Sequence, residues 1–223
     1  MNARIFQVLD PDRVRHLASA LAAESFADGR ATATGMAREV KRNLQFEHTG
    51  PEPTARERIV LDALAGHAEF RSFALPKRLT MPRFARYSPG MEYGTHLDDA
   101  VMGTAPAAIR TDLSLTLFLA EPDTYDGGEL VLELPLGEQE IKLAAGEAVV
   151  YPSTTLHRVA PVTRGERLVC IAWVESLVRD EGLRAILFDL AQSSALAEQR
   201  GQRDLATLTA RSYHNLLRRY AET

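Results

Sequence analysis

Residues 113–134 read LSLTLFLAEPDTYDGGELVLEL, and this stretch carries the clearest structural signal in the chain. Leucine occupies every second position over residues 113–119 and again over residues 130–134. Successive side chains of a β-strand point to opposite faces, so each run predicts a strand with one face in a core. Asp126-Gly127-Gly128 lies between the runs and is interpreted as a turn, because no helix start follows it as a phosphate cradle would require.

The same kind of signal extends over about residues 79–175. Short β-prone runs are separated there by turn sequences such as Ser88-Pro89-Gly90, Leu136-Gly137 and Ala145-Gly146. Several short strands at this spacing are typical of a β-sandwich or β-barrel. The middle of the chain therefore predicts an all-β core.

Helical patterns flank this core on both sides. Asp10-Pro11-Asp12 predicts a helix start, with the helix ending near Phe26-Ala27, and Thr54 to Glu57 forms a capping-box pattern ahead of a second helix. From about Asp180 apolar residues recur at helical intervals. We expect an α+β protein in three regions: N-terminal helices over 1–77, a β domain over 78–178 and a helical region over 179–223.

Composition narrows the classes of function. The chain has 223 residues, a formal net charge of -4 and a single cysteine, Cys170. This charge gives no footprint for nucleic acid or an anionic membrane as the main partner, and one cysteine leaves no thiolate-rich metal site. The N-terminus lacks the apolar run of a signal peptide and no stretch has the length of a membrane span, so we expect a cytoplasmic protein whose metal ligands are nitrogen and oxygen.

Tyr93-Gly94-Thr95-His96-Leu97-Asp98 places a histidine and a carboxylate two residues apart at an expected strand end. Side chains two apart on a strand share one face, so both can reach one metal ion, whereas Asp99 points to the opposite face from His96. His157 begins another β-prone run after the expected loop 151–155. The three side chains predict a metal site with His96, Asp98 and His157 as ligands.

Two histidines and one carboxylate on one face of an octahedral iron(II) leave three coordination positions open. A bidentate 2-oxo acid takes two of them and dioxygen the third, which suits an oxygenase. Arg167 lies ten residues after His157 and offers a guanidinium fork to a distal carboxylate, so we assign it to 2-oxoglutarate. Arg164, nearer the turn at Gly165, is the alternative anchor.

These residues lie within a longer resemblance to the bacterial PKHD-type hydroxylases, members of the prolyl 4-hydroxylase-like oxygenase superfamily. The resemblance spans nearly the whole chain and is carried by the following runs: Arg86-Tyr87, 93–98, 110–114, 125–130, Tyr151-Pro152-Ser153, Leu156-His157, 161–165, Trp173 and 213–218.

The resemblance implies that the β region is a double-stranded β-helix, or jelly roll, with iron(II) between its sheets. It implies the same metal ligands, 2-oxoglutarate on Arg167, Tyr87 against 2-oxoglutarate, and ascorbate as a reductant. Phe118 falls where some relatives have a tyrosine. The resemblance also suggests a link to bacterial iron acquisition, and Asp98 favours hydroxylation over halogenation. It does not define the substrate as a peptide or a small molecule.

Two other functions remain open from the residues. A non-catalytic β-barrel sensor or binding protein would use the same histidines for a structural zinc, which usually has four closed ligands. A metal-dependent isomerase or hydrolase of cupin type would work without 2-oxoglutarate. The apolar stripe at Leu205, Leu208 and Leu216 could cover the barrel, gate the substrate or pair two subunits, and we expect a homodimer.

Overall fold

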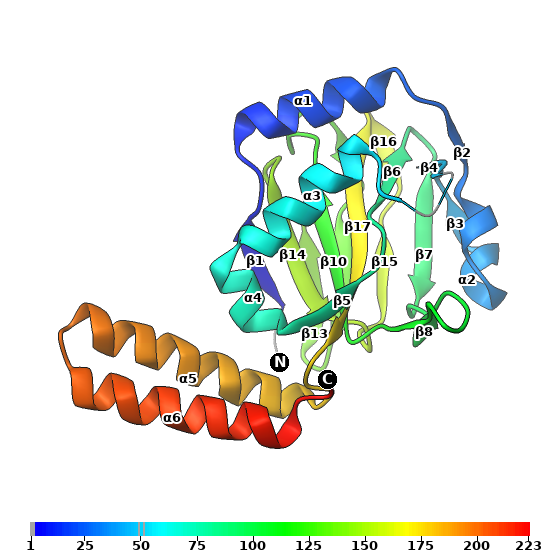
Figure 1. Ribbon diagram of the computed structural model, residues 1–223. Helices are drawn as coiled ribbons and strands as arrows, with labels where there is room; N and C mark the ends of the chain where they lie inside the picture. The colour runs from blue at the N-terminus through cyan, green and yellow to red at the C-terminus, as the bar shows by residue number, and fades with distance from the viewer. Residues whose placement is uncertain (1–2, 49, 51) are drawn as a thin grey trace.

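The computed structural model describes residues 3–48, 50 and 52–223, and two antiparallel sheets form the centre of the molecule (Figure 1). The major sheet has eight strands, in the order β1 (Arg4–Gln7), β14 (Glu147–Pro152), β10 (Leu113–Phe118), β17 (Arg167–Ser176), β6 (Arg83–Tyr87), β4 (Leu44–Phe46) and β2 (Phe26–Asp28), with β5 (Pro76–Leu79) also paired to β17. The minor sheet has five strands, in the order β13 (Gly137–Ile141), β12 (Leu130–Leu134), β15 (His157–Val159), β7 (Glu92–His96) and β3 (Lys41–Arg42).

Two small sheets and the helices complete the fold. The small sheets pair β11 (Asp126–Gly127) with β16 (Val162–Arg164), and β8 (Val101–Met102) with β9 (Ile109–Arg110). The helices are α1 (Pro11–Ala22), the 3-10 helix η1 (Gly29–Thr32), α2 (Gly35–Glu39), α3 (Ala55–Gly66), α4 (Ala68–Ala74), α5 (Glu181–Gln199) and α6 (Arg203–Tyr220).

Helices α1, α3 and α4 cover the outer face of the major sheet (Figure 1). Leu113, Leu115 and Leu117 of β10 belong to the same buried cluster as Leu17 of α1 and Leu64 of α3. Burying a leucine side chain contributes about 1.5–3 kcal/mol, so the alternating leucines fix which face of β10 meets the helices.

The opposite face of β10 carries Ser114, Thr116 and Phe118, which lie between the two sheets. All six residues of β10 are buried, so this strand has no solvent-exposed face. The two facing antiparallel sheets agree with the expected double-stranded β-helix, and the alternation of β10 directs its hydroxyls into the space between them.

The N-terminal region is less helical than the sequence predicted. Residues 1–77 were expected to be helical, but β1 to β4 lie within them and pair with strands of both sheets. The first helix ends at Ala22 rather than near Phe26-Ala27, because Phe26 begins β2 and pairs with Phe46. These strands are two to four residues long, too short for a periodic signal.

Two predicted helix starts have the expected caps. The Asp10 side chain accepts a hydrogen bond from the Arg13 backbone amide at 2.8 Å. At the start of α3 the Thr54 backbone amide donates to the Glu57 side chain at 2.7 Å, which is half of a capping box. Each cap satisfies a backbone amide that has no partner within the helix.

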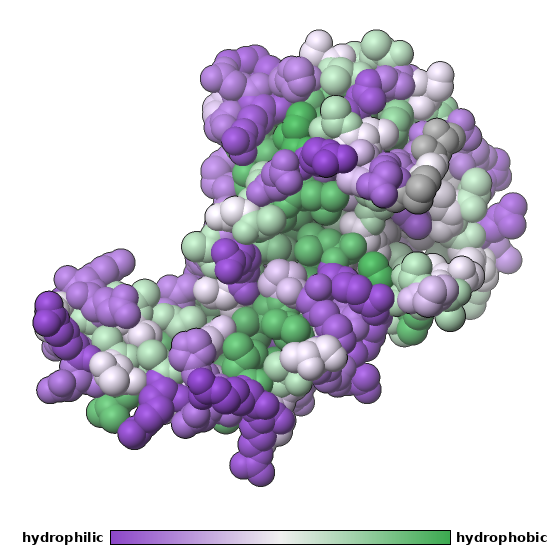
Figure 2. Space-filling model, viewed as in Figure 1, coloured by the Kyte–Doolittle hydropathy of each residue, from purple (hydrophilic) through white to green (hydrophobic). Residues whose placement is uncertain are grey.

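Helices α5 and α6 form an antiparallel hairpin that projects from the body (Figure 1). The expected apolar stripe divides in two: Leu216 packs against the buried cluster of Leu75, Val178 and Leu187, whereas Leu205 and Leu208 are about half exposed. Figure 2 shows hydrophobic surface over the junction of hairpin and body and mostly hydrophilic surface over α1. Within the described part of the chain, no helix combines the length and the apolarity needed to span a membrane.

Candidate active site

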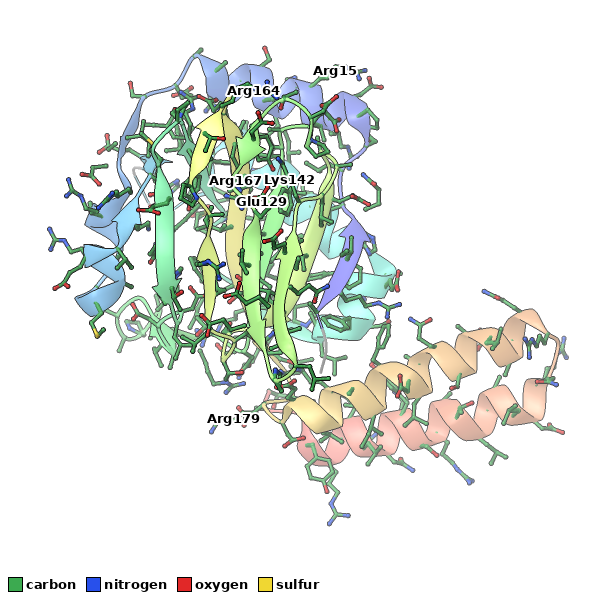
Figure 3. The ribbon with its side chains drawn as sticks, turned by 180° about the vertical axis from the view of Figure 1, so that it is seen from behind. Arg15, Glu129, Lys142, Arg164, Arg167 and Arg179 are labelled. Carbon is green, nitrogen blue, oxygen red and sulfur yellow. The ribbon has the colours of Figure 1, made fainter. Side chains whose placement is uncertain are left out.

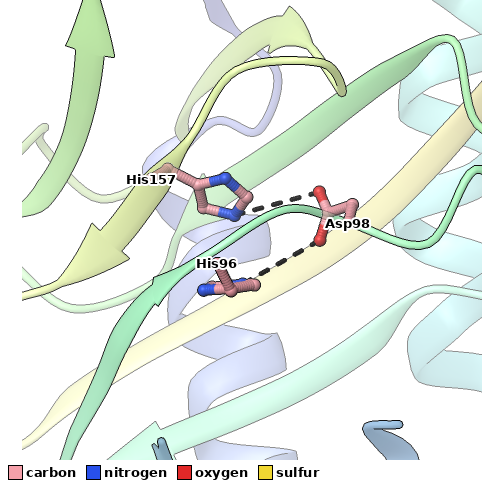
Figure 4. Close-up of side chains that lie close together, drawn as sticks. All are labelled: His96, Asp98 and His157. Carbon is pink, nitrogen blue, oxygen red and sulfur yellow. Dashed lines mark ion pairs between the residues drawn. The ribbon is translucent and has the colours of Figure 1, made fainter. Parts of the chain in front are cut away.

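His96, Asp98 and His157 converge on one point at the inner side of the minor sheet (Figure 4). The Nε2 atom of His96 lies 4.0 Å from Asp98 Oδ1, and the Nε2 atom of His157 lies 3.9 Å from Asp98 Oδ2. One ligand atom from each of the three residues lies within 4.8 Å of the others. Two donors each about 2.1 Å from one ion lie at most about 4.2 Å apart, so the separations of the two histidines from Asp98 fit a shared metal ion better than direct hydrogen bonds.

The backbone fixes the orientation of both imidazoles. His96 Nδ1 lies 2.8 Å from the Gly94 carbonyl oxygen, and His157 Nδ1 lies 3.0 Å from the Thr155 carbonyl oxygen. Because a carbonyl oxygen only accepts, each Nδ1 donates its proton and each Nε2 keeps a lone pair for the centre. Burial, together with the neighbouring His157, lowers the pKa of His96 to about 4, so that its imidazole is neutral and able to bind a metal at neutral pH.

Asp98 is oriented by two serines from the major sheet side. Ser114 Oγ donates to Asp98 Oδ2 at 2.5 Å and lies 2.8 Å from Ser153 Oγ. Asp99, the alternative ligand, is exposed and accepts hydrogen bonds from Thr34 Oγ1 at 3.1 and 3.2 Å. The structure therefore brings Asp98 together with the two histidines and leaves Asp99 out of the group.

Arg167 lies between the two sheets, at the start of β17 and opposite Tyr87 of β6 (Figure 3). It is only 1% exposed, and its guanidinium carbon lies 5.0 Å from the Tyr87 ring centroid and 5.4 Å from that of Phe118. Among the described residues it has no carboxylate within ion-pair distance, and its buried Nε has no hydrogen-bond partner. A buried cation without an anionic partner is costly, so this site calls for an anion.

Arg164, the alternative anchor, lies at the surface. Its Nε donates to Asp126 Oδ2 at 2.7 Å and its Nη2 donates to Asp126 Oδ1 at 3.0 Å. The side chain is 59% exposed. Figure 3 shows it near the edge of the sheets, beyond Arg167. Arg164 thus already has an anionic partner and does not face the cavity.

Four tyrosines surround Arg167 or line its cavity. Tyr87, Tyr93 and Tyr151 line the cavity, and the buried hydroxyl of Tyr125 makes no hydrogen bond to the other described residues. Burial raises the pKa of Tyr87 and of Tyr125, and the nearby Arg167 opposes both shifts. Phe118 supplies no hydroxyl, as expected, and these tyrosines provide hydroxyls that the sequence analysis, apart from Tyr87, did not assign.

A cavity of about 330 Å³ extends from the group of His96, Asp98 and His157 to Arg167. Its wall includes apolar residues of both sheets, such as Leu130 and Ile171, and residues of the N-terminal segment, such as Thr32 and Lys41. This volume suits a small molecule or a single side chain. The sequence analysis missed Ser114, although the alternation of β10 placed it opposite the leucines, and missed Lys41, for which no pattern was available.

Residues 82–175 match the 2OG-Fe(II) oxygenase superfamily, which is the class of enzyme that this fold and this set of side chains define. Residues 181–222 match the PKHD-type hydroxylase C-terminal domain. A PKHD-type hydroxylase of Maricaulis maris is 49% identical over 217 residues, covering 97% of each chain. One from Shewanella baltica strain OS185 is 45% identical over 224 residues, covering 100% of each. The chain belongs to the PKHD-type hydroxylase family and is a 2-oxoglutarate-dependent dioxygenase.

Solved structures show the same fold. A prolyl-4-hydroxylase from Pseudomonas putida aligns with a TM-score of 0.60 and 25% identity, covering 78% of this chain and 92% of that one. HygX from Streptomyces hygroscopicus, solved with nickel, 2-oxoglutarate and hygromycin B, aligns with a TM-score of 0.53 and 12% identity, covering 79% and 84%. The family carries iron(II) and 2-oxoglutarate and uses dioxygen, and the donor set of this chain fits that chemistry.

Proposed function

We propose that the chain hydroxylates an unreactive C–H group of a small-molecule or peptidyl substrate, with His96, Asp98 and His157 holding iron(II) and Arg167 and Tyr87 binding 2-oxoglutarate. The observation that supports this most directly is the opening of one cavity onto both the three convergent ligand atoms and a buried arginine without an anionic partner among the described residues. When bound, iron(II), 2-oxoglutarate and dioxygen supply an oxidant while 2-oxoglutarate becomes succinate and CO2.

The side chains of this protein have separate tasks in that reaction. His96 and His157 offer neutral nitrogens, and Asp98 offers one negative charge that partly balances the metal. Arg167 offers its guanidinium to the distal carboxylate of 2-oxoglutarate, with Tyr87 beside it. Leu130, Val159 and Ile171 line the cavity and limit the access of water to it.

Anaerobic addition of iron(II) and 2-oxoglutarate tests the proposal. The wild type is expected to develop the weak visible charge-transfer band of a 2-oxoglutarate chelate and, in air, to release succinate without added substrate. Asp98→Ala should abolish both signals. Asp99→Ala is the matched control, since it removes an adjacent exposed carboxylate, and should retain both. Unchanged succinate release in Asp98→Ala would contradict the assigned ligands.

Arginine variants test the 2-oxoglutarate site separately. Arg167→Gln is expected to raise the Kd for 2-oxoglutarate by about 10- to 100-fold, since hydrogen bonds to charged groups contribute about 1.5–3 kcal/mol. Arg164→Gln makes the same chemical change at the surface and should leave the Kd unchanged. Equal effects of the two substitutions would remove Arg167 from the proposal.

The zinc-sensor alternative is not favoured. Among the described residues the convergent group contains three ligands, whereas structural zinc usually has four. A cupin-type isomerase or hydrolase gives Arg167 no task. We further propose ascorbate as the reductant, a cytoplasmic location, no nucleic-acid or membrane partner and a role in bacterial iron acquisition. The homodimer stays a prediction, which sedimentation equilibrium would test.

A further inference from the structure

Two cationic side chains from opposite sheets, Arg83 and Lys41, line the cavity next to the predicted metal ligands. Arg83 begins β6 and shares the inner face of that strand with Tyr87, four residues further on. Lys41 lies on β3, the edge strand of the minor sheet, where it pairs with Tyr93. Both line the same cavity as His96. Neither has a task in the proposed binding of iron or 2-oxoglutarate.

Lys41 is buried, and among the described residues no carboxylate lies within ion-pair distance of its Nζ, although Asp98 and Asp28 act on its charge from further away. The residue is 4% exposed, and its Nζ donates to Thr32 Oγ1 at 3.0 Å. Nζ also lies 5.2 Å from the ring centroid of Tyr93, which stacks on His96 with centroids 3.6 Å apart. The ammonium group and a proposed metal ligand thus contact the same ring, that of Tyr93.

Arg83 has even fewer partners. Its guanidinium carbon lies 5.5 Å from the ring centroid of Trp173, and within the described part of the chain its side chain has no hydrogen bond and no ion pair. The indole Nε1 of Trp173, another cavity residue, is buried without an acceptor among those same residues. Burial lowers the pKa of Arg83, and burial together with the charge of Arg83 lowers the pKa of Lys41. An anion in this part of the cavity would relieve these unfavourable effects.

The charges of bound iron(II) and 2-oxoglutarate, and those of Asp98 and Arg167, would cancel without neutralising Lys41 or Arg83. Iron(II) carries two positive charges and 2-oxoglutarate two negative ones, while Asp98 and Arg167 balance each other. Lys41 and Arg83 then add two positive charges to the cavity wall, and Asp99 offsets one of them. One positive charge remains, which matches a singly charged anion.

We propose that Lys41 and Arg83 recognise a carboxylate on the organic substrate, so that this enzyme hydroxylates a small carboxylic acid. The inference rests on the proposed function, because it takes the metal and 2-oxoglutarate to occupy the rest of the cavity. Trp173 supplies a flat apolar surface next to Arg83, which suits a hydrocarbon portion adjoining the carboxylate. A cavity of about 330 Å³ limits the size of that portion.

Matched acid and amide probes test this inference on the full-length protein loaded with zinc and saturated with 2-oxoglutarate, so that Arg167 is occupied. Saturation-transfer NMR measures the Kd of phenylacetate against phenylacetamide, and of N-acetylglutamate amide against N-acetylglutamine amide. The wild type should prefer an acid over its amide by about tenfold, as expected for hydrogen bonds to a charged group. Preference in the first pair alone indicates a free acid, and preference in the second pair alone indicates a carboxylate on a peptide side chain and overturns the small-acid proposal.

Single substitutions then locate the selectivity. Arg83→Gln and Lys41→Met should each reduce the acid preference about tenfold while leaving the Kd of the amide unchanged. Arg42→Gln is the matched control: Arg42 follows Lys41 in β3, has a 68% exposed side chain and lies 3.4 Å from Glu92. It should keep the full preference.

Failure of the carboxylate site and failure of the proposed function would give different results. Equal affinity for acid and amide in the wild type, or an acid preference that survives in both Arg83→Gln and Lys41→Met, would overturn the carboxylate site. Absence of metal-dependent 2-oxoglutarate binding in the wild type would instead overturn the proposed function. Because Arg83→Gln and Lys41→Met alter different sheets, misfolding of one variant leaves the other, and the wild-type comparison needs no variant.

Discussion

His157 stands directly across from His96 in the antiparallel pairing of β15 with β7, and their ring centroids lie 4.3 Å apart. Residues that face each other in such a pair have Cα atoms about 4.5–5.5 Å apart. The hydrogen bonding of the sheet therefore sets the separation of the two imidazoles before any metal binds. Asp98 lies two residues after the end of β7, and its carboxylate lies near both imidazoles.

Metal binding should stabilise a protein that is already folded. The two sheets and the helix layer bury large apolar clusters without using the metal ligands, so chelation is expected to lower the Tm without unfolding the chain. At a hundredfold excess over Kd, binding contributes about 2.7 kcal/mol, or roughly 5–10 °C in Tm. Differential scanning calorimetry with manganese(II) and with EDTA measures this. The Tm difference should vanish in Asp98→Ala and persist in Asp99→Ala.

Removal of the hydroxyl that positions Asp98 should weaken metal binding. Ser114→Ala deletes the donor to Asp98 Oδ2, and loss of such a partner behind a ligand typically costs about 10- to 100-fold in metal affinity. Competition titration with a chromophoric chelator gives the Kd. Ser153→Ala is the control, because Ser153 contacts Ser114 but makes no hydrogen bond to Asp98, and its effect should be several times smaller. Equal effects would mean that the pair acts only through packing.

Two buried arginines should respond in opposite ways to the same substitution. Arg184 is 2% exposed and donates to the carbonyl oxygens of Val178 and Arg179 at 2.8 and 2.7 Å, so Arg184→Met should lower the free energy of unfolding by about 1–3 kcal/mol. Arg167 lacks such partners in the described chain, so Arg167→Met should leave the ligand-free protein equally or more stable while abolishing its stabilisation by 2-oxoglutarate. Urea unfolding with and without 2-oxoglutarate measures both. A large loss of stability in ligand-free Arg167→Met would show an internal partner.

Gly128 keeps space open for Arg167. Its φ is 69°, and a Cβ there would lie 2.9 Å from Val162 Cγ2, 3.0 Å from Arg167 Cδ and 3.2 Å from Tyr125 Cε2. Gly128→Ala should therefore displace Arg167 and raise the Kd for 2-oxoglutarate, besides the backbone cost of about 1 kcal/mol. Gly201 has φ 70° with nothing within 4 Å of the added Cβ, so Gly201→Ala should incur the backbone cost alone. Calorimetric titration with 2-oxoglutarate distinguishes the two. Unchanged binding in Gly128→Ala would mean that the guanidinium tolerates the shift.

Lys41 should make the ligand-free protein more stable as the pH rises above 8. Burial, then the charge of Arg83, lowers its folded pKa from 10.5 to about 8, with Asp98 and Asp28 opposing. Between these values the unfolded chain binds the proton and the folded chain has released it, so stability increases with pH. The gain from pH 8 to 9.5 should be on the order of 1–2 kcal/mol. Urea unfolding of Lys41→Met should show a smaller increase, and an identical pH profile would place the titration elsewhere.

The sequence indicated which carboxylate would lie beside His96, because strand periodicity acts locally. A spacing of two residues selects Asp98 over Asp99 on any extended strand, and the structure separates them in that way. The same periodicity in β10 directs Ser114 inward, although the sequence analysis assigned only the leucine face to a core. Residues 151–155 were expected to form a loop, but Tyr151 and Pro152 end β14, because their partners in β10 lie far away in the sequence.

The edge strands could not be predicted for a different reason. Lys41 and Arg42 form a two-residue strand whose only signal is the pairing with β7, and no local propensity marks it. The sequence marks Arg83 only as an ordinary charged residue, because its position beside Trp173 and in the same cavity as Lys41 follows from the tertiary structure. The surroundings of such residues depend on tertiary contacts. No local pattern in a single sequence predicts those contacts.

The cavity wall formed by Thr32, Thr34 and Lys41 comes from a part of the chain that precedes residue 82, where the match to the oxygenase superfamily begins. The three convergent side chains and Arg167 all come after it. Substitutions in the early stretch can therefore reshape one wall of the cavity while every side chain of the reactive centre stays in place. New preferences can evolve in such an enzyme without a loss of its chemistry along the way.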